Sequence, residues 1–554
     1  MTWRVTDPQC NESAKIKWEI VEYTRGIGLD IGCGIQKLYP HWTGVDNKAD
    51  ERLFGHPINP DITVDTAERL PRFATESHDF CFSSHLLEHI EPERVTGALK
   101  EWMRIIKPKG YLILYLPDED EYPKHGKSGC QHDWPISKAK GSGYIVPKEP
   151  CTLCGEENGA NLDHKWNVNY DRVIQYMRGA GGWDLIDFQK RNEDREYSLY
   201  FVFKKTNSGQ HESWKNKPPK PEKTCGVVRY GAFGDLLQAS SVFAGLKAQG
   251  YHVTLYTSPP GDEVVKHDPN IDAFYYQDKD QVPNHLLGEY WAYHKKKYDK
   301  WVNLSESVEG TFLALPGRTL HNWSPKLRHS MMNRNYLEIQ HELAGVPHVP
   351  RVKFFPTEEE KVWAKKQRAK MGDFLIGWPL AGSSVHKTWG GLDSIIASVM
   401  LDFPNVHFAL LGGPAAKILE QGWENEKRVH RTSGQWSIRQ SIAFMSQVDM
   451  AIGPETGLMN AASEFDYPKV VFLSHSTHEN LTRDWNNVYP LASEHTVCPG
   501  RGDNEAPACH QLHYTWEHCK KSENSIAQCQ EDISVEDTYK VIWHVLTRAL
   551  AEAA

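Results

Sequence analysis

The sequence predicts an α/β protein built from parallel, Rossmann-like sheets. Three observations predict it. Short apolar runs alternate with helical patterns along the 554 residues, several runs end in glycine-rich turns, and a polar, proline-rich stretch divides the pattern into two regions. Apolar runs separated by helical patterns are typical of strands joined by crossover helices. The length is enough for roughly three or four structural units.

The stretch Thr206–Thr224 is predicted to be a linker. It reads TNSGQHESWKNKPPKPEKT and contains three prolines, many lysines and few apolar residues. Such a segment is solvated and semi-extended. It separates an N-terminal domain, residues 1–205, from a C-terminal region that a proline-rich break near residues 347–356 divides again. The expected subdomains of the C-terminal region are 225–350 and 351–554.

Apolar runs of strand length occur on both sides of the linker. Before it they are Ile27–Ile31, Trp42–Val45, Phe80–Ser83, Tyr111–Leu116, Trp183–Gln189 and Ser198–Phe203. The last two are joined by a short charged turn, which predicts an antiparallel hairpin. After the linker, a first set is Gly226–Arg229, His252–Tyr256 and Trp301–Leu304, and another is Phe374–Gly377, Val406–Leu411, Met450–Ile452 and Val470–Leu473. Two sets predict two doubly wound subdomains facing a cleft.

The composition argues against some classes of protein. Lys and Arg number 63 against 72 Asp and Glu, for a net charge of -9. Because phosphate binding needs an excess of basic residues, a nucleic-acid partner is possible but not favoured. No run approaches the roughly 18 apolar residues that span a bilayer. Residues 1–17 lack the apolar core of a signal peptide, so we expect a cytoplasmic protein.

A glycine turn follows the first expected strand, in the run GLDIGCG that ends at Gly34. Glycines there let backbone N–H groups approach a ligand closely. Asp46 ends the next strand, where an acid can accept hydrogen bonds from two ribose hydroxyls. Asp65, in TVDTAERLP, can hold an adenine amino group. The alternative interpretation is a tight turn followed by two solvated acids.

The N-terminal domain resembles class I S-adenosylmethionine-dependent methyltransferases, particularly the methyltransferase type 11 group. The resemblance covers residues 16–205 and depends on LDIGCG, GVD, FSSHLLEHI and IKPKGYLILYLP. It implies S-adenosylmethionine as the cofactor, with the cofactor-binding residues Asp30, Gly32, Gly34, Asp46, Asp65, Ser84 and His85. Gly32 and Gly34 would line the methionine moiety, with Asp46 at the ribose and Asp65 at the adenine. Gln36 stands where many members carry a third glycine.

The run His85-Leu86-Leu87-Glu88-His89 also has the H-x-x-E-H spacing of an inverted zinc-protease motif. A zinc site of that kind needs a helix and a third ligand. The run instead follows an expected strand directly, and the methyltransferase resemblance already explains it. A protease is therefore the disfavoured alternative.

An insertion at residues 126–160 contains Cys130, His132, Cys151 and Cys154. C-x-H followed by C-x-x-C supplies four ligands suited to tetrahedral zinc. A structural zinc ion would order a loop that is otherwise polar. The alternative is two reduced thiol pairs in a mobile loop, and the spacing leaves both open.

Four runs in the C-terminal region each join a strand to a helix start through small residues. They are VVRYGAFGDLL at 227–237, GWPLAGSSVHKTW at 377–389, LLGGP at 410–414 and IGPETGLMNAA at 452–462. Small hydroxyl residues and a lysine beside a helix start can cradle a diphosphate. Each run alone is an ordinary turn between a strand and a helix. The occurrence of all four in this order along the chain is a more specific pattern.

Together these runs resemble glycosyltransferase family nine, the ADP-heptose:lipopolysaccharide heptosyltransferase-like enzymes of GT-B fold, from residue 224 onward. The resemblance implies a nucleotide-diphosphate sugar as donor and an inverting transfer with Asp235 as the catalytic base. It implies a donor site formed by Ser383, Ser384, Lys387, Glu455, Thr456 and Gly457, the first three at the diphosphate. Glu455 and Asn460 replace an Asp and a His that are common in heptosyltransferases.

The sequence thus predicts a methyltransferase domain followed by a GT-B pair, acting on a small-molecule donor and a glycan-type acceptor. One alternative is a phage-type enzyme that modifies a DNA base, and another is a binding scaffold with one inactive domain. The motifs do not name the sugar, the nucleotide, the acceptor, the methylated atom or the oligomeric state.

Overall fold

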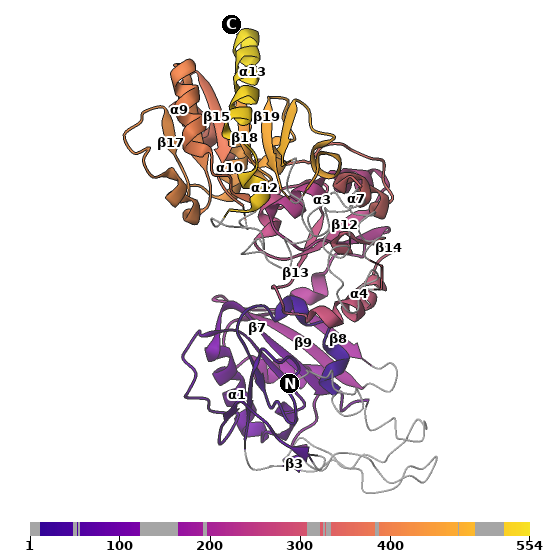
Figure 1. Ribbon diagram of the computed structural model, residues 1–554. Coiled ribbons are helices and arrows are strands. Elements are labelled where there is room, and N and C mark those ends of the chain that lie inside the picture. The colour runs from indigo at the N-terminus through magenta and orange to yellow at the C-terminus, as the bar shows by residue number, and fades with distance from the viewer. Residues whose placement is uncertain are drawn as a thin grey trace. The chain divides into compact units, whose positions relative to one another are not determined.

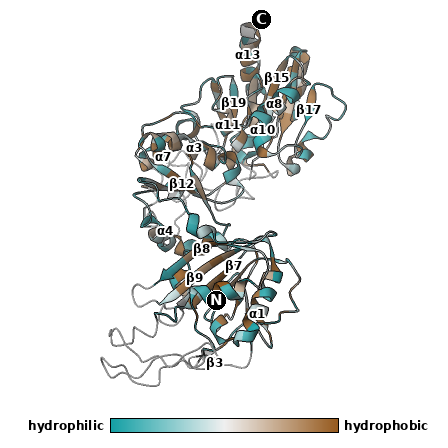
Figure 2. Cartoon of the chain, turned by 180° about the vertical axis from the view of Figure 1, so that it is seen from behind, coloured by the Kyte–Doolittle hydropathy of each residue, from teal (hydrophilic) through white to brown (hydrophobic). Residues whose placement is uncertain are grey.

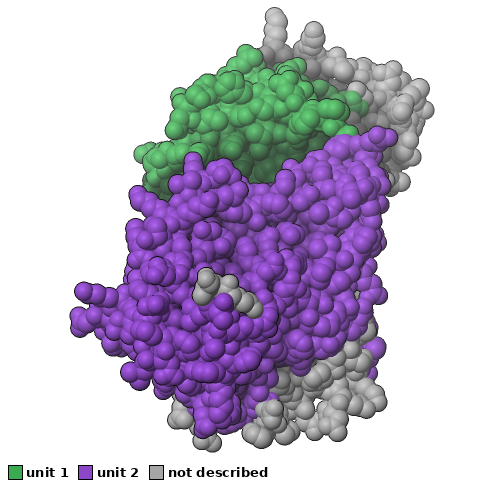
Figure 3. Space-filling view, turned by 90° about the horizontal axis from the view of Figure 1, so that it is seen from above, with its two compact units in different colours: residues 1–220 green, residues 221–554 purple. Residues whose placement is uncertain are grey.

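In the computed structural model the chain forms two compact units, Met1–Lys220 and Pro221–Ala554 (Figure 3). The boundary between them lies inside the predicted linker, 206–224. The structure describes residues 12–47, 52–53, 56–121, 164–191, 197–306, 322–324, 327, 334–382, 387–474, 476–493 and 526–553.

Unit 1 contains a mixed sheet whose described strands follow the order β10-β8-β9-β7-β6-β1-β2-β5. Figure 1 labels β7, β9 and β8, three neighbours in this sheet. Strand β9 is antiparallel to β7 and β8, which confirms the predicted closing hairpin, and the other neighbours are parallel. The bounds are β1 Gly28–Ile31, β2 Thr43–Asp46, β5 Ile62–Thr63, β6 His78–Ser84, β7 Ile106–Pro117, β8 Trp183–Arg191, β9 Ser198–Lys205 and β10 Gln210–His211. A separate hairpin joins β3 (Arg52–Leu53) to β4 (His56–Pro57).

Helix α1 (Pro92–Ile105) shows how the sequence covers this sheet. Pro92 suits the first turn because the N–H that it lacks has no partner inside the helix there. Val95, Leu99 and Trp102 recur at helical spacing and are fully buried. A second helix, α2, spans Tyr170–Met177. Figure 2 shows hydrophobic residues along β7 and β9, the strands at the centre of this core.

Unit 2 contains two parallel sheets, with described strands in the orders β13-β12-β11-β14 and β17-β16-β15-β18-β19-β20. In each sheet the first strand along the chain lies inside, which is a doubly wound order. The predicted fold class is therefore confirmed. The bounds are β11 Thr224–Val228, β12 His252–Thr257, β13 Ala273–Tyr276, β14 Lys300–Asn303, β15 Phe374–Pro379, β16 Val406–Leu411, β17 Val429–Arg431, β18 Met450–Pro454, β19 Lys469–Leu473 and β20 Val488–Ala492.

Helices connect and cover these strands. Their bounds are α3 Phe233–Ala248, α4 Leu287–Lys295, α7 Tyr336–Ala344, α8 Glu358–Arg368, α9 Leu392–Asp402, α10 Ile438–Met445, α11 Gly457–Ala462, α12 Gln528–Glu531 and α13 Val535–Ala553. Strands β13, β17 and β20 are not predicted by the sequence pattern. All three lie at sheet edges, and β17 reads VHR, which is too short and too polar to be recognised as a strand from its pattern.

Helices α3 and α11 join the two sheets of unit 2. One hydrophobic core contains residues from both sheets, including Val227 of β11 and Val471 of β19. The helices approach closely at their first turns. A Cβ added to Gly457 would lie 3.1 Å from Phe233 Cβ, and one added to Gly234 would lie 2.9 Å from Asn460 Nδ2. The first turns of α3 and α11, which carry the motifs at 227–237 and 452–462, therefore lie against each other.

No helix among the described residues combines the length and the apolar character needed to cross a membrane.

The space around two glycines of unit 1 predicts how their replacement by alanine changes stability. A Cβ on Gly28 would lie 1.9 Å from Phe80 Cζ, so Gly28→Ala should lower the stability of unit 1 by about 1–3 kcal/mol, as overpacking does. Gly97 in α1 has nothing within 4 Å of such a Cβ. Gly97→Ala should therefore raise stability, by up to about 1 kcal/mol. Thermal melts of both variants measure these effects. A change in melting temperature of the same sign for Gly28→Ala and Gly97→Ala would contradict the packing described for the two glycines.

Candidate active sites

The turn after β1 takes a backbone shape that favours glycine. Gly32 and Gly34 have φ of 77° and 57°, in the left-handed region. A Cβ on Gly32 would also lie 2.8 Å from the Leu86 side chain. The Gly34 N–H donates to Asp46 Oδ2 at 2.8 Å, which joins the carboxyl ends of β1 and β2. The local sequence therefore builds a backbone-lined turn with an acid beside it.

A pocket of ≈ 170 Å³ opens at this edge of the sheet. It brings together three of the predicted cofactor residues, Gly32, Asp46 and Asp65. The remaining lining residues are Val45, Asn47, Val64, Thr66, Ala67, Glu68, Leu86, His89 and Ile90. The predicted residues Asp30, Gly34, Ser84 and His85 lie near this edge but do not line the pocket.

The two acids of the β1–β2 region have different environments. Asp46 is half-buried, and its Oδ1 accepts a hydrogen bond from Asn47 N at 2.8 Å. Asp30 is buried, and its Oδ2 accepts from Leu38 N at 2.9 Å. Burial raises the pKa of Asp30 to about 7, with the nearby Asp46 charge adding to the rise and the Leu38 hydrogen bond opposing it.

The run after β6 is not a long helix. Residues Leu87–His89 form one 3-10 turn, so the structure lacks the helix that the zinc-protease interpretation needs. His85 has φ of 49°, and its Nδ1 lies 3.2 Å from Glu88 Oε1. Ser84 is the last residue of β6. The structure does bring a third ligand-type side chain, His164, close to Glu88 and His89.

In unit 2 the predicted base, Asp235, lies in the first turn of α3. Its Oδ2 accepts a hydrogen bond from Ala232 N at 2.7 Å, and its Oδ1 pairs with Arg229 Nη2 at 3.0 Å. Arg229 is fully buried, whereas the Asp235 side chain is 31% exposed. The helix start and the guanidinium both favour the ionised carboxylate. The sequence gives no sign of the Arg229 pair, which depends on the fold of the turn.

The predicted donor residues follow two neighbouring parallel strands, β15 and β18. Lys387 lies in the turn after β15, where its backbone O accepts from Gly382 N at 3.0 Å. Thr456 caps α11 through a hydrogen bond from Met459 N at 3.3 Å, and Gly457 begins that helix. These residues share the carboxyl edge of one sheet, where doubly wound folds bind ligands.

Glu455 is also at this edge, but it is 3% exposed. Its Oε1 accepts hydrogen bonds from the N–H and the hydroxyl of Ser474, which ties the ends of β18 and β19 together. Ser383 and Ser384 lie outside the described residues, as do the predicted zinc ligands Cys130, His132, Cys151 and Cys154.

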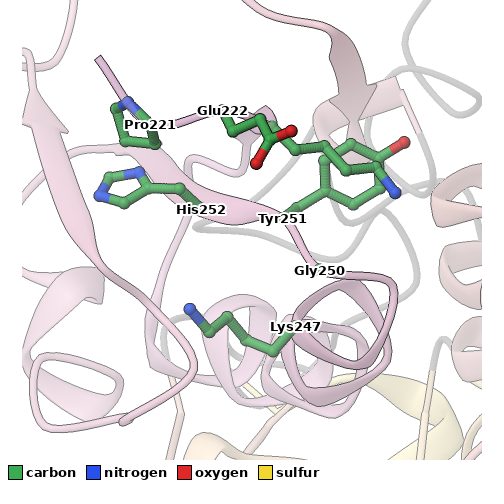
Figure 4. A pocket seen from close by; sticks show the side chains of 7 residues that line it. Pro221, Glu222, Lys247, Gly250, Tyr251 and His252 are labelled. Atoms are coloured by element: carbon green, nitrogen blue, oxygen red, sulfur yellow. The ribbon is translucent and has the colours of Figure 1, made fainter. Parts of the chain in front are cut away.

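A second pocket lies at the opposite edge of the first sheet of unit 2 (Figure 4). Its lining residues come from the last turn of α3, the segments before β11 and β12, and the first residue of β12. They are Pro221, Glu222, Lys223, Lys247, Gly250, Tyr251 and His252. Lys223 Nζ lies 4.2 Å from the centre of the Tyr251 ring. Because ligands of doubly wound sheets bind at the carboxyl ends of the strands, we assign this pocket no catalytic role.

Comparison with known proteins agrees with the motifs of unit 1. Residues 29–114 match the family described as a methyltransferase domain. This match indicates that the chain is a transferase. A search of curated proteins found no match.

Solved structures similar to the chain include both predicted classes. A family 9 glycosyltransferase from Veillonella parvula is 16% identical, covering 60% of this chain and 99% of its own, with a TM-score of 0.43. The E. coli ADP-heptose lipopolysaccharide heptosyltransferase II is 14% identical, covering 60% and 100%, with a TM-score of 0.41. A SAM-dependent methyltransferase from Methanosarcina mazei is 19% identical, covering 34% and 98%, with a TM-score of 0.25.

The environment of Asp30 predicts a pH effect on stability. The raised pKa, about 7 against 3.8 for an ordinary Asp, means that the folded chain binds more protons than the unfolded chain between those values. Stability is therefore highest below the lower pKa and falls as pH rises through the upper one. Asp30→Asn removes this titration. It should stabilise unit 1 little at pH 4 and by as much as about 4 kcal/mol at pH 8, at about 1.36 kcal/mol per pH unit.

Urea unfolding of the wild type and the Asp30→Asn variant at the two pH values measures this difference. An equal effect of the substitution at both values would contradict a buried carboxyl that titrates near neutrality.

Proposed function

We propose that unit 1 is an S-adenosylmethionine-dependent methyltransferase and that unit 2 is an inverting glycosyltransferase that uses a nucleotide-diphosphate sugar, with a glycan or glycoconjugate as the acceptor. The convergence of Gly32, Asp46 and Asp65 on one pocket supports the first activity. Those three residues were predicted from separate motifs, and each offers a contact that the cofactor needs.

In unit 1 the backbone at Gly32 would lie along the methionine moiety of the cofactor. The Asp46 carboxylate would accept hydrogen bonds from the ribose hydroxyls, and Asp65 from the adenine amino group. The bound cofactor supplies a methyl group on a positively charged sulfur. Because this transfer mainly requires an in-line approach of the acceptor, the pocket contributes chiefly by positioning.

In unit 2 the Asp235 carboxylate would take the proton of the acceptor hydroxyl as that oxygen attacks the anomeric carbon of the donor. The bond between the sugar and the diphosphate breaks, and its electron pair leaves with the diphosphate. Lys387, with Ser383 and Ser384, would stabilise the negative charge of that leaving group. The attack comes from the face opposite the leaving group, which inverts the anomeric configuration.

Asp46→Ala tests the cofactor site. Removing two charge-assisted hydrogen bonds, worth about 1.5–3 kcal/mol each, should weaken S-adenosylmethionine binding at least about 100-fold. Calorimetry measures the affinity. Asp171→Ala is the matched control, because Asp171 is an exposed acid of the same unit outside the pocket. Glycosyl transfer should be unchanged in both variants, and unchanged cofactor affinity in Asp46→Ala would remove Asp46 from the site.

Asp235→Asn and Lys387→Ala separate catalysis from donor binding. Asp235→Asn should lower turnover by about 10²–10⁴-fold because it removes the proton acceptor, and donor affinity should stay near normal because the proposed diphosphate contacts come from other residues. Lys387→Ala should weaken donor binding as well as turnover. Asp280→Asn, at an exposed acid outside the donor and acceptor motifs, should change neither.

Steady-state rates, donor titrations and melting temperatures of these variants give the comparison. The melts are needed because Asp235→Asn also removes the anionic partner of the buried Arg229. Near-normal turnover in folded Asp235→Asn would exclude Asp235 as the base.

A further inference from the structure

Three ligand-type side chains of unit 1 converge beside the cofactor pocket. One ligand atom from each of Glu88, His89 and His164 lies within 4.8 Å of those of the other two. His89 also lines the pocket together with Gly32 and Asp46. The cluster therefore borders the space assigned to the cofactor, although the predicted cofactor contacts do not use it.

Hydrogen bonds between distant segments hold the cluster in place. Lys165 N donates to the backbone O of Glu88 at 2.8 Å, and Trp166 Nε1 donates to Leu87 O at 3.1 Å. Trp166 is fully buried. These contacts fix His164 against the 3-10 turn that carries Glu88 and His89, so the three side chains are positioned by packed backbone.

Glu88 is the unusual member because it is a fully buried acid. Its carboxylate oxygens accept no hydrogen bond from the residues that the structure describes, although His85 Nδ1 lies 3.2 Å away. A buried, ionised carboxylate is costly unless a cation accompanies it.

A second carboxylate orients His164. Glu119, which follows β7 and is 4% exposed, pairs with His164 Nδ1. That contact leaves Nε2 as the nitrogen that can bind a metal. A carboxylate behind a histidine is the usual outer partner of a metal-binding imidazole, because it fixes the ring and raises its basicity.

We propose that Glu88, His89 and His164 bind one divalent transition-metal ion, with Glu119 as a positioning residue. Two imidazole nitrogens and one carboxylate oxygen suit ions such as Zn²⁺ and leave coordination positions open. The role of the ion rests on the proposed methyl transfer, in which an oxygen of the methyl acceptor fills one open position. The acceptor is then a hydroxyl compound whose pKa the metal lowers.

The step balances without any further reagent. The metal-bound hydroxyl loses its proton to solvent, and its oxygen forms a bond to the methyl carbon. The carbon–sulfur bond breaks, and its electron pair neutralises the sulfonium to a thioether. The products are a methyl ether, the thioether and one proton.

Metal content of the full-length chain tests the site. Wild type and variants are dialysed against Zn²⁺, freed of excess ion and measured by elemental analysis. Glu88→Gln and His164→Gln should each lose one equivalent relative to wild type. His211→Gln, at an exposed histidine of the same unit, should retain that equivalent. Glu119→Gln should weaken Zn²⁺ affinity about 10–100-fold.

Circular dichroism checks that the variants fold, and His89→Gln replaces Glu88→Gln if the latter does not. Folded variants with the metal content of wild type would overturn the metal site. Calorimetry with S-adenosylmethionine separates the two proposals. The wild type could hold the Zn²⁺ equivalent that Glu88→Gln loses and still fail to bind S-adenosylmethionine. That result would overturn the methyltransferase assignment and leave the metal site standing.

The acceptor role has its own probe. Catechol, a simple chelating diol, should bind to the Zn²⁺-loaded wild type but not to Zn²⁺-treated Glu88→Gln, as measured by calorimetry. No binding of catechol to the Zn²⁺-loaded wild type would overturn the hydroxyl-acceptor role and leave the metal site standing.

Discussion

The arrangement of unit 1 depends on the parallel pairing of β1 with β2 and β6. Parallel strands end at the same edge of a sheet, so the segments that follow them are brought together whatever their distance in sequence. The Gly34–Asp46 hydrogen bond then fixes the turn after β1 to the end of β2. The pocket and the Glu88 cluster are both consequences of this shared edge.

Two buried acids of unit 1 show how strongly local surroundings decide charge. Asp30 is surrounded by protein with one backbone donor and another acid nearby, and its pKa rises to about 7. Glu88 is equally buried, yet the imidazoles beside it lower its pKa. Burial favours the neutral form in both cases, and the nearby charges determine the outcome.

In unit 2, as in unit 1, the proposed site residues follow the carboxyl ends of parallel strands, but they come from two sheets. Helices α3 and α11 start at the carboxyl ends of β11 and β18, and small residues at Gly234 and Gly457 let those starts approach closely. Asp235 is held there by a buried arginine and by the backbone of its own turn. A guanidinium and a helix start both favour the ionised form of a carboxylate, which is the form that a general base requires.

The sequence by itself determined the central strands, the closing hairpin of unit 1, the glycine turns and the glycine and two acids that meet in the pocket. These features are local, because hydrophobic periodicity and turn conformation depend on residues that are close together in the sequence. Only the tertiary structure decided the rest. The edge strand β17 reads VHR and lacks an apolar run, and the Arg229–Asp235 pair depends on the fold of one turn. The approach of His164 to Glu88 joins segments some 76 positions apart in the chain. Contacts of that kind depend on packing, and no spacing in the sequence encodes them.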